Sequence, residues 1–319
     1  MKTLLQTVFF FLLTTQICFT QWEWQSPLVT SSTMYDVILI DENNGWSVGE
    51  NGTILFTTDD GLNWSQQESG TSNNLKGVCF VDNNTGWVVG DSGTILITSN
   101  GGVDWTQQLT GINNNLWSVS FSDANNGWSV GNQVMIHTTN GGTTWISQPS
   151  GYDLYSVCFV DASNGWIVGD GPYDDDPILH TTNGGINWTL QPNSLQMADG
   201  WLQDIYFIDL NNGYAVGHHS SGADWYGTIL RTTNGGLVWT SIASETHTIL
   251  HSVKFTDLSS GWIVGGRVDY GERAVVLKTT NAGIDWSKEI LNSNQGFKAI
   301  SFRNNNVGTL VGEFGRIFC

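Results

Sequence analysis

Short runs of alternating apolar and polar residues recur along almost the whole chain, separated by turns rich in glycine and asparagine. In one copy, residues 78–82 alternate, residues 86–90 read Gly-Trp-Val-Val-Gly, residues 94–98 read Thr-Ile-Leu-Ile-Thr, and a turn follows that closes on Trp105. β-Branched and aromatic residues in runs this short, bounded by turn residues, are typical of strands. With the polar run after Trp105, each copy predicts four short antiparallel strands.

This pattern returns after about forty residues, and six copies are complete. A four-stranded unit repeated at this period is characteristic of a β-propeller blade. One blade leaves a sheet face uncovered, so the blades are expected to stack into a ring. The second strand of each copy carries Trp46, Trp87, Trp128, Trp166, Tyr214 or Trp262, and the closing tryptophans are Trp64, Trp105, Trp145, Trp188, Trp239 and Trp286.

A seventh copy begins at Phe297 and supplies three strands before Cys319. Residues 22–26 read Trp-Glu-Trp-Gln-Ser and resemble the runs that follow the closing tryptophans. We expect this N-terminal strand to complete the last blade, because a closed ring leaves no open sheet edge. The sequence therefore predicts an all-β, seven-bladed β-propeller over residues 21–319, with four-stranded antiparallel blades and the last blade closed by the N-terminal strand.

Residues 1–20 have the layout of a cleavable secretory signal. Lys2 precedes an apolar run over residues 4–13, which is too short to span a membrane, and we expect cleavage near Thr20. Acylation of Cys18, as in a lipoprotein, would require a small residue at position 17, and Ile17 therefore disfavours this alternative. We therefore expect a secreted protein, extracellular or periplasmic, with no membrane insertion.

The charge balance excludes several kinds of partner. The chain carries 29 acidic residues against 11 Lys and Arg, a formal net charge of -18. So few cations cannot supply the phosphate contacts that dominate nucleic-acid affinity, and anionic membranes and glycans are disfavoured for the same reason. A strongly acidic surface favours a soluble, self-repelling monomer.

Three cysteines follow the signal segment: Cys79, Cys158 and Cys319. Cys79 and Cys158 occupy the same position in two copies that are not adjacent, each within Val-Cys-Phe. This placement predicts buried, unpaired thiols, not a disulfide.

The turn before each closing tryptophan reads Thr-Thr-Asn-Gly-Gly-x-x-Trp at residues 138–145, 181–188 and 232–239. It resembles the Asp-box repeat of sialidases, sortilin-like receptors and certain glycoside hydrolases. The whole repeat is most similar to the photosystem II assembly and stability factor family of propellers, over residues 22–319. That resemblance implies a protein partner bound through a basic surface patch, which contrasts with the acidic charge of this chain. The turn residues have structural duties, since Asn and Gly favour tight turns.

Catalysis is not predicted, and neither is a cofactor. A sialidase needs three arginines around its substrate, and none of the five arginines lies in the segment that marks those enzymes. A glycosidase needs two carboxylates across a cleft. The recurring Asp82, Asp123, Asp161, Asp209 and Asp257 share one repeat position and are interpreted as turn residues. A polysaccharide-degrading glycoside hydrolase of the Asp-box propeller kind is the alternative.

One position just before each first strand varies freely from copy to copy. Either these residues pack on their neighbours at strand ends, or they line a binding mouth at one end of the central channel. The positions are Tyr35, Lys76, Trp117, Tyr155, Gln203, His251 and Lys298.

The loops between second and third strands lengthen in copies 4 to 6, at residues 171–177, 218–226 and 267–273, on the same predicted face. Long loops on a rigid scaffold usually carry binding, so we predict a protein or carbohydrate partner on the loop-rich face of blades 4 to 6. Asp174–Asp176 near His218 and His219 could hold a cation, but no ligand spacing supports a site. The candidate loop contacts are Tyr173, Asp174, His218, Trp225, Tyr226, Arg267, Tyr270 and Arg273.

Overall fold

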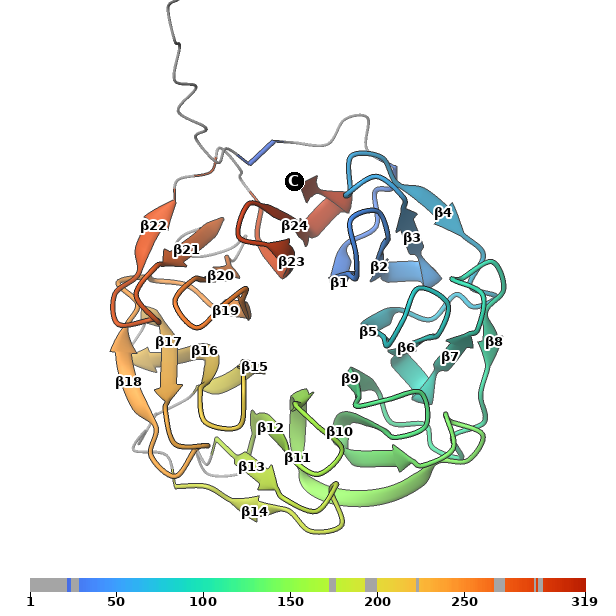
Figure 1. The fold of residues 1–319 in the computed structure, drawn as a ribbon, viewed down its shortest axis with the longest axis horizontal. Helices are drawn as coiled ribbons and strands as arrows, with labels where there is room; N and C mark the ends of the chain where they lie inside the picture. The colour runs from blue at the N-terminus through green and yellow to red at the C-terminus, as the bar shows by residue number, and fades with distance from the viewer. Residues whose placement is uncertain are drawn as a thin grey trace, which may run out of the picture.

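The computed structural model describes residues 22–23, 29–171, 176–192, 200–221, 224–266, 273–289, 291 and 295–319. Within them the strands form a ring of sheets around a central channel (Figure 1). The strand that begins each repeat lies nearest the channel, and later strands lie progressively farther out (Figure 1). The all-β propeller class is therefore confirmed.

The first two sheets each contain four antiparallel strands in sequence order. A short 3-10 turn joins the second strand to the third in both, η1 (Glu50–Gly52) and η2 (Asp91–Gly93). The strands are β1 (Met34–Leu39), β2 (Gly45–Gly49), β3 (Ile54–Thr57), β4 (Ser65–Gln67), β5 (Leu75–Phe80), β6 (Gly86–Gly90), β7 (Ile95–Thr98) and β8 (Thr106–Gln107).

The third and fourth repeats share one six-stranded sheet, and three further sheets follow. The six strands of the shared sheet are β9 (Leu116–Phe121), β10 (Gly127–Thr138), β11 (Ile146–Phe159), β12 (Gly165–Asp170), β13 (Ile178–Thr181) and β14 (Thr189–Leu190). The next two sheets have four strands each: β15 (Trp201–Phe207), β16 (Gly213–Ser221), β17 (Asp224–Thr232), β18 (Thr240–Ala243), β19 (Leu250–Phe255), β20 (Gly261–Gly265), β21 (Val275–Thr279) and β22 (Ser287–Glu289). The last sheet has β23 (Phe297–Asn304), β24 (Val307–Gly312) and β25 (Ile317–Phe318), with η3 (Glu313–Gly315) between the last two strands.

The prediction of seven four-stranded blades is wrong, because the described strands pair into six sheets of three, four or six strands. The stretch from Trp128 to Thr138 is one residue shorter than the stretch from Trp87 to Thr98. Strand β10 consequently runs through without a 3-10 turn, and β11 continues from one repeat into the next. Asn132 pairs with Asp153 where the two long strands meet, which joins the third and fourth repeats into one sheet.

The predicted fourth strand of the last sheet is also absent from the described residues, since this sheet has three strands. Instead, Glu23 and Cys319 exchange two backbone hydrogen bonds, of 2.8 and 3.0 Å. Trp22 packs edge-on against Phe302, with ring centroids 5.8 Å apart, and donates its indole N–H to Glu289 at 3.0 Å. Residues 22–23 thus meet the last sheet through a short contact, and the rest of the predicted N-terminal strand lies outside the described residues.

Aromatic stacking between consecutive repeats forms much of the core. The second-strand tryptophan of one repeat stacks on the first-strand phenylalanine of the next, as Trp87 does on Phe121 with ring centroids 3.5 Å apart. The closing Trp145 then meets Phe121 edge-on at 6.0 Å. Both arrangements are favoured geometries for aromatic pairs. Because each phenylalanine contacts two repeats, the packing links neighbours around the ring.

The Asp-box turns are structural, as the sequence predicted. In the second repeat, the Thr98 hydroxyl accepts the Gly102 N–H at 2.8 Å and the Asn100 side chain accepts the Asp104 N–H at 3.0 Å. Trp105 donates its indole N–H to Gln67 of the preceding repeat at 3.1 Å. Side-chain acceptors thus satisfy the turn amides, and the closing tryptophan ties one repeat to another.

The recurring aspartates are turn residues too. Asp82 accepts the backbone N–H groups of Asn84 and Thr85 at 2.7 and 2.8 Å, and these bonds hold the pKa of its carboxyl below the usual value. Equivalent bonds from Asn44 and Asn43 lower the pKa of Asp41 to about 2. Such carboxylates stay ionised as acceptors at neutral pH. Their hydrogen bonds account for their recurrence without a catalytic role.

Candidate functional site

Each repeat places a β-bulge at the start of its first strand. In β1, Met34 pairs with Gly49 and Asp36 pairs with Val48, so Tyr35 is left over between them. A bulge residue is unpaired and its side chain can be turned toward a new direction. The bulge residues are the seven variable positions of the sequence: Tyr35, Lys76, Trp117, Tyr155, Gln203, His251 and Lys298.

A glycine at the end of each second strand makes room for the bulge. A β-carbon on Gly169 would lie 2.0 Å from the carbonyl oxygen of Asp153, which precedes the bulge. Across the seven repeats the corresponding distance is between 1.9 and 2.3 Å, too short for any side chain. The second glycine of Gly-Trp-x-Val-Gly is therefore required by backbone packing. The glycines are Gly49, Gly90, Gly131, Gly169, Gly217, Gly265 and Gly312.

All seven bulge residues line the same cavity, which has a volume of about 540 Å³ and occupies the central channel. Every one of them is half-buried and follows a fully buried neighbour such as Met34 or Leu154. The structure therefore brings together the seven residues that the sequence grouped at one end of the channel. We call them the channel ring.

An aromatic chain extends from one side of the channel ring. The rings of Trp117 and Tyr155 stack with centroids 4.8 Å apart, and Tyr155 lies 6.4 Å from Trp201. Trp201 meets Trp225 at 6.2 Å, and the buried His218 packs against Trp201 at 4.1 Å. Sequence reasoning missed Trp201, although it is the one aromatic residue among positions such as Asn74, Asn115 and Asp153 that precede the bulges by two residues.

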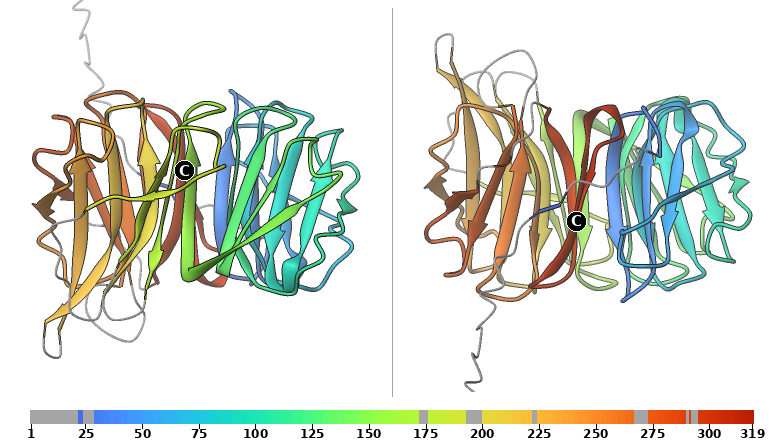
Figure 2. Two further views of the ribbon diagram at one scale, coloured as in Figure 1. Left: turned by 90° about the horizontal axis from the view of Figure 1, so that it is seen from below. Right: turned by 90° about the horizontal axis from the view of Figure 1, so that it is seen from above.

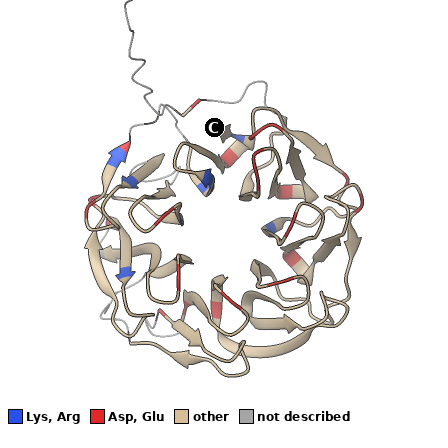
Figure 3. Cartoon of the chain, viewed as in Figure 1, with Lys and Arg blue, Asp and Glu red and all other residues tan. Residues whose placement is uncertain are grey.

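Charged groups occupy the other side of the channel ring. The Lys76 ammonium lies 3.5 Å above the ring of Tyr35, whose hydroxyl donates to Glu50 at 3.2 Å. Lys298 lies 3.8 Å from Glu313 and 3.3 Å from the His251 ring. Figure 3 shows basic and acidic positions together around the channel. In a chain this acidic, three of six lysines, Lys76, Lys254 and Lys298, line the cavity.

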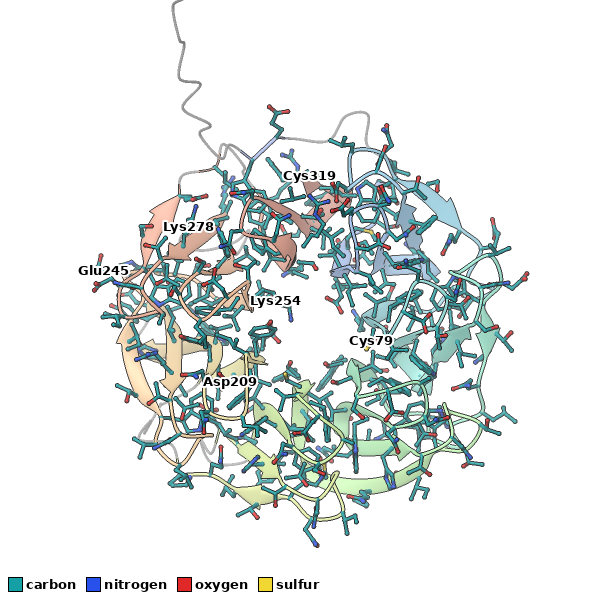
Figure 4. All side chains as sticks on the ribbon, viewed as in Figure 1. Cys79, Asp209, Glu245, Lys254, Lys278 and Cys319 are labelled. Carbon is teal, nitrogen blue, oxygen red and sulfur yellow. The ribbon has the colours of Figure 1, made fainter. Side chains whose placement is uncertain are left out.

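Two carboxylates and Lys254 lie deeper in the channel, and sequence reasoning missed them. Asp204 accepts the N–H of Ile205, the N–H of Val253 and the Ser156 hydroxyl at 2.9, 2.9 and 2.7 Å. Figure 4 shows the Lys254 side chain extending into the channel. Burial opposes its charge, but attraction by Asp204 and Asp36 leaves its pKa raised.

Asp36 is the counterpart of Asp204 in the first repeat. It accepts the N–H of Val37 at 2.8 Å and the N–H of Val78 in the next repeat at 2.9 Å. Burial raises its pKa to about 6 despite these bonds. Because both carboxylates bind backbone amides of two repeats, they act as ties between repeats. The signal for them was the residue after each bulge, which is Asp in these two repeats and Gly, Ser or Ala in the others.

The long loops are described only in part. Trp225 and Tyr226 lie on β17, whose hairpin with β16 extends beyond the neighbouring strands on one face of the ring (Figure 2). Tyr226 stacks on His219 at 5.5 Å, and Arg273 is exposed. The predicted contacts Tyr173, Asp174, Arg267 and Tyr270 lie outside the described residues.

The described residues include no group of three or more His, Cys, Asp or Glu side chains that could hold a metal ion. His137 and His180 stack on the tryptophans of their own repeats, at 4.5 and 4.6 Å from Trp128 and Trp166. They are packing residues of their blades. In the same part of the chain, no helix is long and apolar enough to cross a membrane.

Cys79 and Cys158 are unpaired, as predicted, but they are half-buried and line the channel cavity. Burial raises the pKa of Cys79 to about 11, so the reactive thiolate is scarce at neutral pH. We expect iodoacetamide at pH 7.5 to modify these thiols much more slowly in the folded protein than in urea. Mass spectrometry of each cysteine peptide checks this, and equal rates in the two states would contradict it.

These features define a class of protein: a β-propeller of similar repeats in which one end of the central channel is lined by residues that differ between repeats. The family model described as photosynthesis system II assembly factor YCF48 matches residues 15–107, 63–152 and 104–198, which together span more than half of the chain. The chain belongs to this family. No curated protein is significantly similar to it over its sequence.

Solved structures support the same fold. A structure of YCF48 bound to D1 peptide is similar with a TM-score of 0.73 and 19% identity, covering 93% of this chain and 95% of that one. YCF48 from Cyanidioschyzon merolae gives a TM-score of 0.73 with 20% identity, covering 93% and 98%. The GH74 xyloglucanase from Xanthomonas campestris is similar at 0.69 with 11% identity, over 93% of this chain and 53% of that one. Identities this low bear on the fold alone.

Proposed function

We propose that this chain is an exported, non-enzymatic propeller that binds a protein partner at the channel ring and along the hairpin of β16 and β17. The observation that carries the proposal is the set of seven bulges, which turns the most variable residue of every repeat into one cavity. Difference between repeats is what specific recognition needs, because identical turns present the same chemistry on every side. The signal-like residues 1–20 support export.

A protein partner is favoured over a carbohydrate by the family, one of whose solved members carries a bound peptide. The chemistry of the channel ring is compatible with a peptide chain. The aromatic chain from Trp117 to Trp225 offers flat apolar surfaces, while Lys76, Lys298 and Glu313 offer charges of both signs. Aromatic anchors beside polar groups are typical of binding hot spots.

Truncation of Trp225 to alanine tests the proposal. We expect the variant to lose about 2 kcal/mol of binding free energy to the partner, roughly thirty-fold in Kd, because an aromatic anchor is removed. The partner is captured from extracellular extract on the immobilised protein, identified, and titrated by calorimetry against each variant.

Asn140→Ala, in an Asp-box turn, is the matched control. It removes an acceptor for the Thr144 N–H and should lower the melting temperature without changing affinity. If the folded control loses binding while Trp225→Ala binds normally, the partner binds at the face of the Asp-box turns and the proposed site is wrong. If the protein binds glycans on an array but captures no protein, the partner is a carbohydrate and the proposal of a protein partner is wrong.

A further inference from the structure

The stacking between repeats fails at one of its six positions. In five of them the aromatic ring of one repeat lies 3.5 to 4.0 Å from the phenylalanine of the next, measured between centroids. Between the third and fourth repeats, Trp128 and Phe159 are nearly parallel but 6.3 Å apart. The five intact stacks are an internal standard, so this opening is a local property of residues around Trp128.

Trp128 is the ring that has moved. Phe159 keeps its edge-on contact with the closing Trp188 at 5.9 Å, as Phe121 does with Trp145 at 6.0 Å. Trp128 instead approaches Trp188 to 5.5 Å. The indole of Trp128 is therefore displaced toward the closing turn of the fourth repeat.

The displaced indole occupies a place that a glutamine fills in three other repeats. A β-carbon on Gly185 would lie 2.1 Å from Cζ2 of Trp128, whereas one on Gly102 would meet the Gln67 amide oxygen at 2.1 Å. Gln67 also accepts the indole N–H of Trp105, but the N–H of Trp188 has no partner among the described residues. The Trp128 indole has thus taken the position of a glutamine amide. Tyr214 similarly comes near Gly283, where a β-carbon would lie 2.6 Å from its ring, but Tyr214 stays stacked on Phe255 at 3.9 Å.

A cavity of about 230 Å³ borders the displaced ring. Trp128, Phe159 and His137 line it, together with Ala162 and Ile186 from two turns. Phe159 is half-buried there, as Phe302 is in the last repeat, whereas Phe80, Phe121, Phe207 and Phe255 are buried. The face of Phe159 that a tryptophan covers elsewhere has lost its usual cover.

We propose that this cavity is a binding site for a single planar aromatic ring that bears a hydroxyl group, a phenol. The ring takes the place on Phe159 that an indole takes in four other repeats and the Tyr214 ring takes in a fifth, where the stacked distance is 3.5 to 4.0 Å. A cavity of about 150 Å³ with apolar walls already admits benzene, so the volume suffices. The imidazole Nδ1 of His137 is buried and has no partner within the described chain, which gives the hydroxyl a hydrogen-bonding group.

The site is independent of the channel ring. Its turns, around Ala162 and Asn183, join first to second and third to fourth strands, whereas the bulges lie at the opposite ends of the first strands. The same chemistry could come from a free phenol or from a tyrosine side chain of another protein. Failure of this proposal would therefore leave the proposed function untouched.

Titration with p-cresol, followed through the His137 resonance in labelled protein, tests the proposal. We expect saturable binding at one site, with the His137 signal shifting more than those of the other five histidines. Acetyl-Gly-Tyr-Gly-amide in a second titration distinguishes the sources: shifts with both ligands point to a tyrosine side chain, and shifts with p-cresol alone point to a free phenol. Cyclohexanol, which is not planar, should not bind.

Ala162→Leu should weaken p-cresol binding by about ten-fold or more, because the larger leucine side chain takes up part of the cavity. The fifth repeat has Leu210 at the same turn position, so leucine fits this turn. Ala124→Leu is the matched control, beside the closed stack of Trp87 on Phe121, and should leave binding unchanged. Equal binding by wild type and Ala162→Leu would overturn the proposal, and so would a crystal structure in which Trp128 stacks on Phe159 as closely as its five counterparts do.

Discussion

Replacement of Asp204 by alanine is expected to lower the free energy of unfolding by about 3 kcal/mol. The carboxylate accepts hydrogen bonds from two backbone amides and one hydroxyl and balances the charge of Lys254. Its loss leaves the N–H groups of Ile205 and Val253 without their acceptor. This expected loss in the free energy of unfolding is at the low end for a charged pair, because the channel admits water. Urea unfolding followed by circular dichroism measures it.

Two further variants separate the charge from the packing. Ser252→Ala, at the same repeat position, is the control and should change stability by less than about 0.5 kcal/mol. Ala299 shows that alanine itself fits this position. Adding Lys254→Met to Asp204→Ala should recover part of the loss, since the uncompensated cation is then gone. If Asp204→Ala unfolds at the same urea concentration as Ser252→Ala, the tie between repeats is not important for stability.

Gly169→Ala should destabilise the fold by about 3 kcal/mol, at the upper end for overpacking. The backbone of Gly169 is extended, so alanine would be acceptable in an open strand. Here its β-carbon would lie 2.0 Å from the carbonyl oxygen of Asp153, and backbone must shift to admit it. We expect the melting temperature to fall by roughly 6–10 °C. Because Tyr155 is the bulge residue beside this contact, its position in the channel ring should change as well.

Gly77→Ser is the matched control for a glycine in the same kind of strand. Ser118 and Ser156 stand at the equivalent position, and the nearest atom to a new β-carbon on Gly77 is 3.1 Å away. This variant should unfold close to the wild-type temperature. A Gly169→Ala protein as stable as Gly77→Ser would mean that the strand relaxes easily and that the bulge does not depend on glycine.

The sequence predicted those features that each repeat determines by itself. The alternation in residues such as Val78 and Phe80, the closing Trp105 and the turn Asn100 specify strands and turns through contacts within about forty residues. Variation at one position, from Tyr35 to Lys298, marked the channel ring because a residue free of the repeat's packing rules is free to differ. These predictions needed no knowledge of how distant repeats meet.

Contacts between repeats were beyond such reasoning. The pairing of Asn132 with Asp153 merges two repeats into one sheet, and it depends on where two long strands lie in space. Trp201 contacts Tyr155 and Trp225 only because the strands that carry these two residues lie near its own strand in the folded ring. Their meeting depends on strand register and loop path, which no single repeat contains.

By itself, the sequence determined the propeller class, the turn chemistry and the residues of the channel ring, since short-range patterning and tight turns set them. The tertiary structure decided the number of sheets, the tie of Asp204 to the Val253 amide of the next repeat and the displacement of Trp128 from Phe159. The physical reason is the same in each case. A hydrogen bond or ring stack between repeats depends on distances between separate strands, and those distances are fixed only when the whole ring packs.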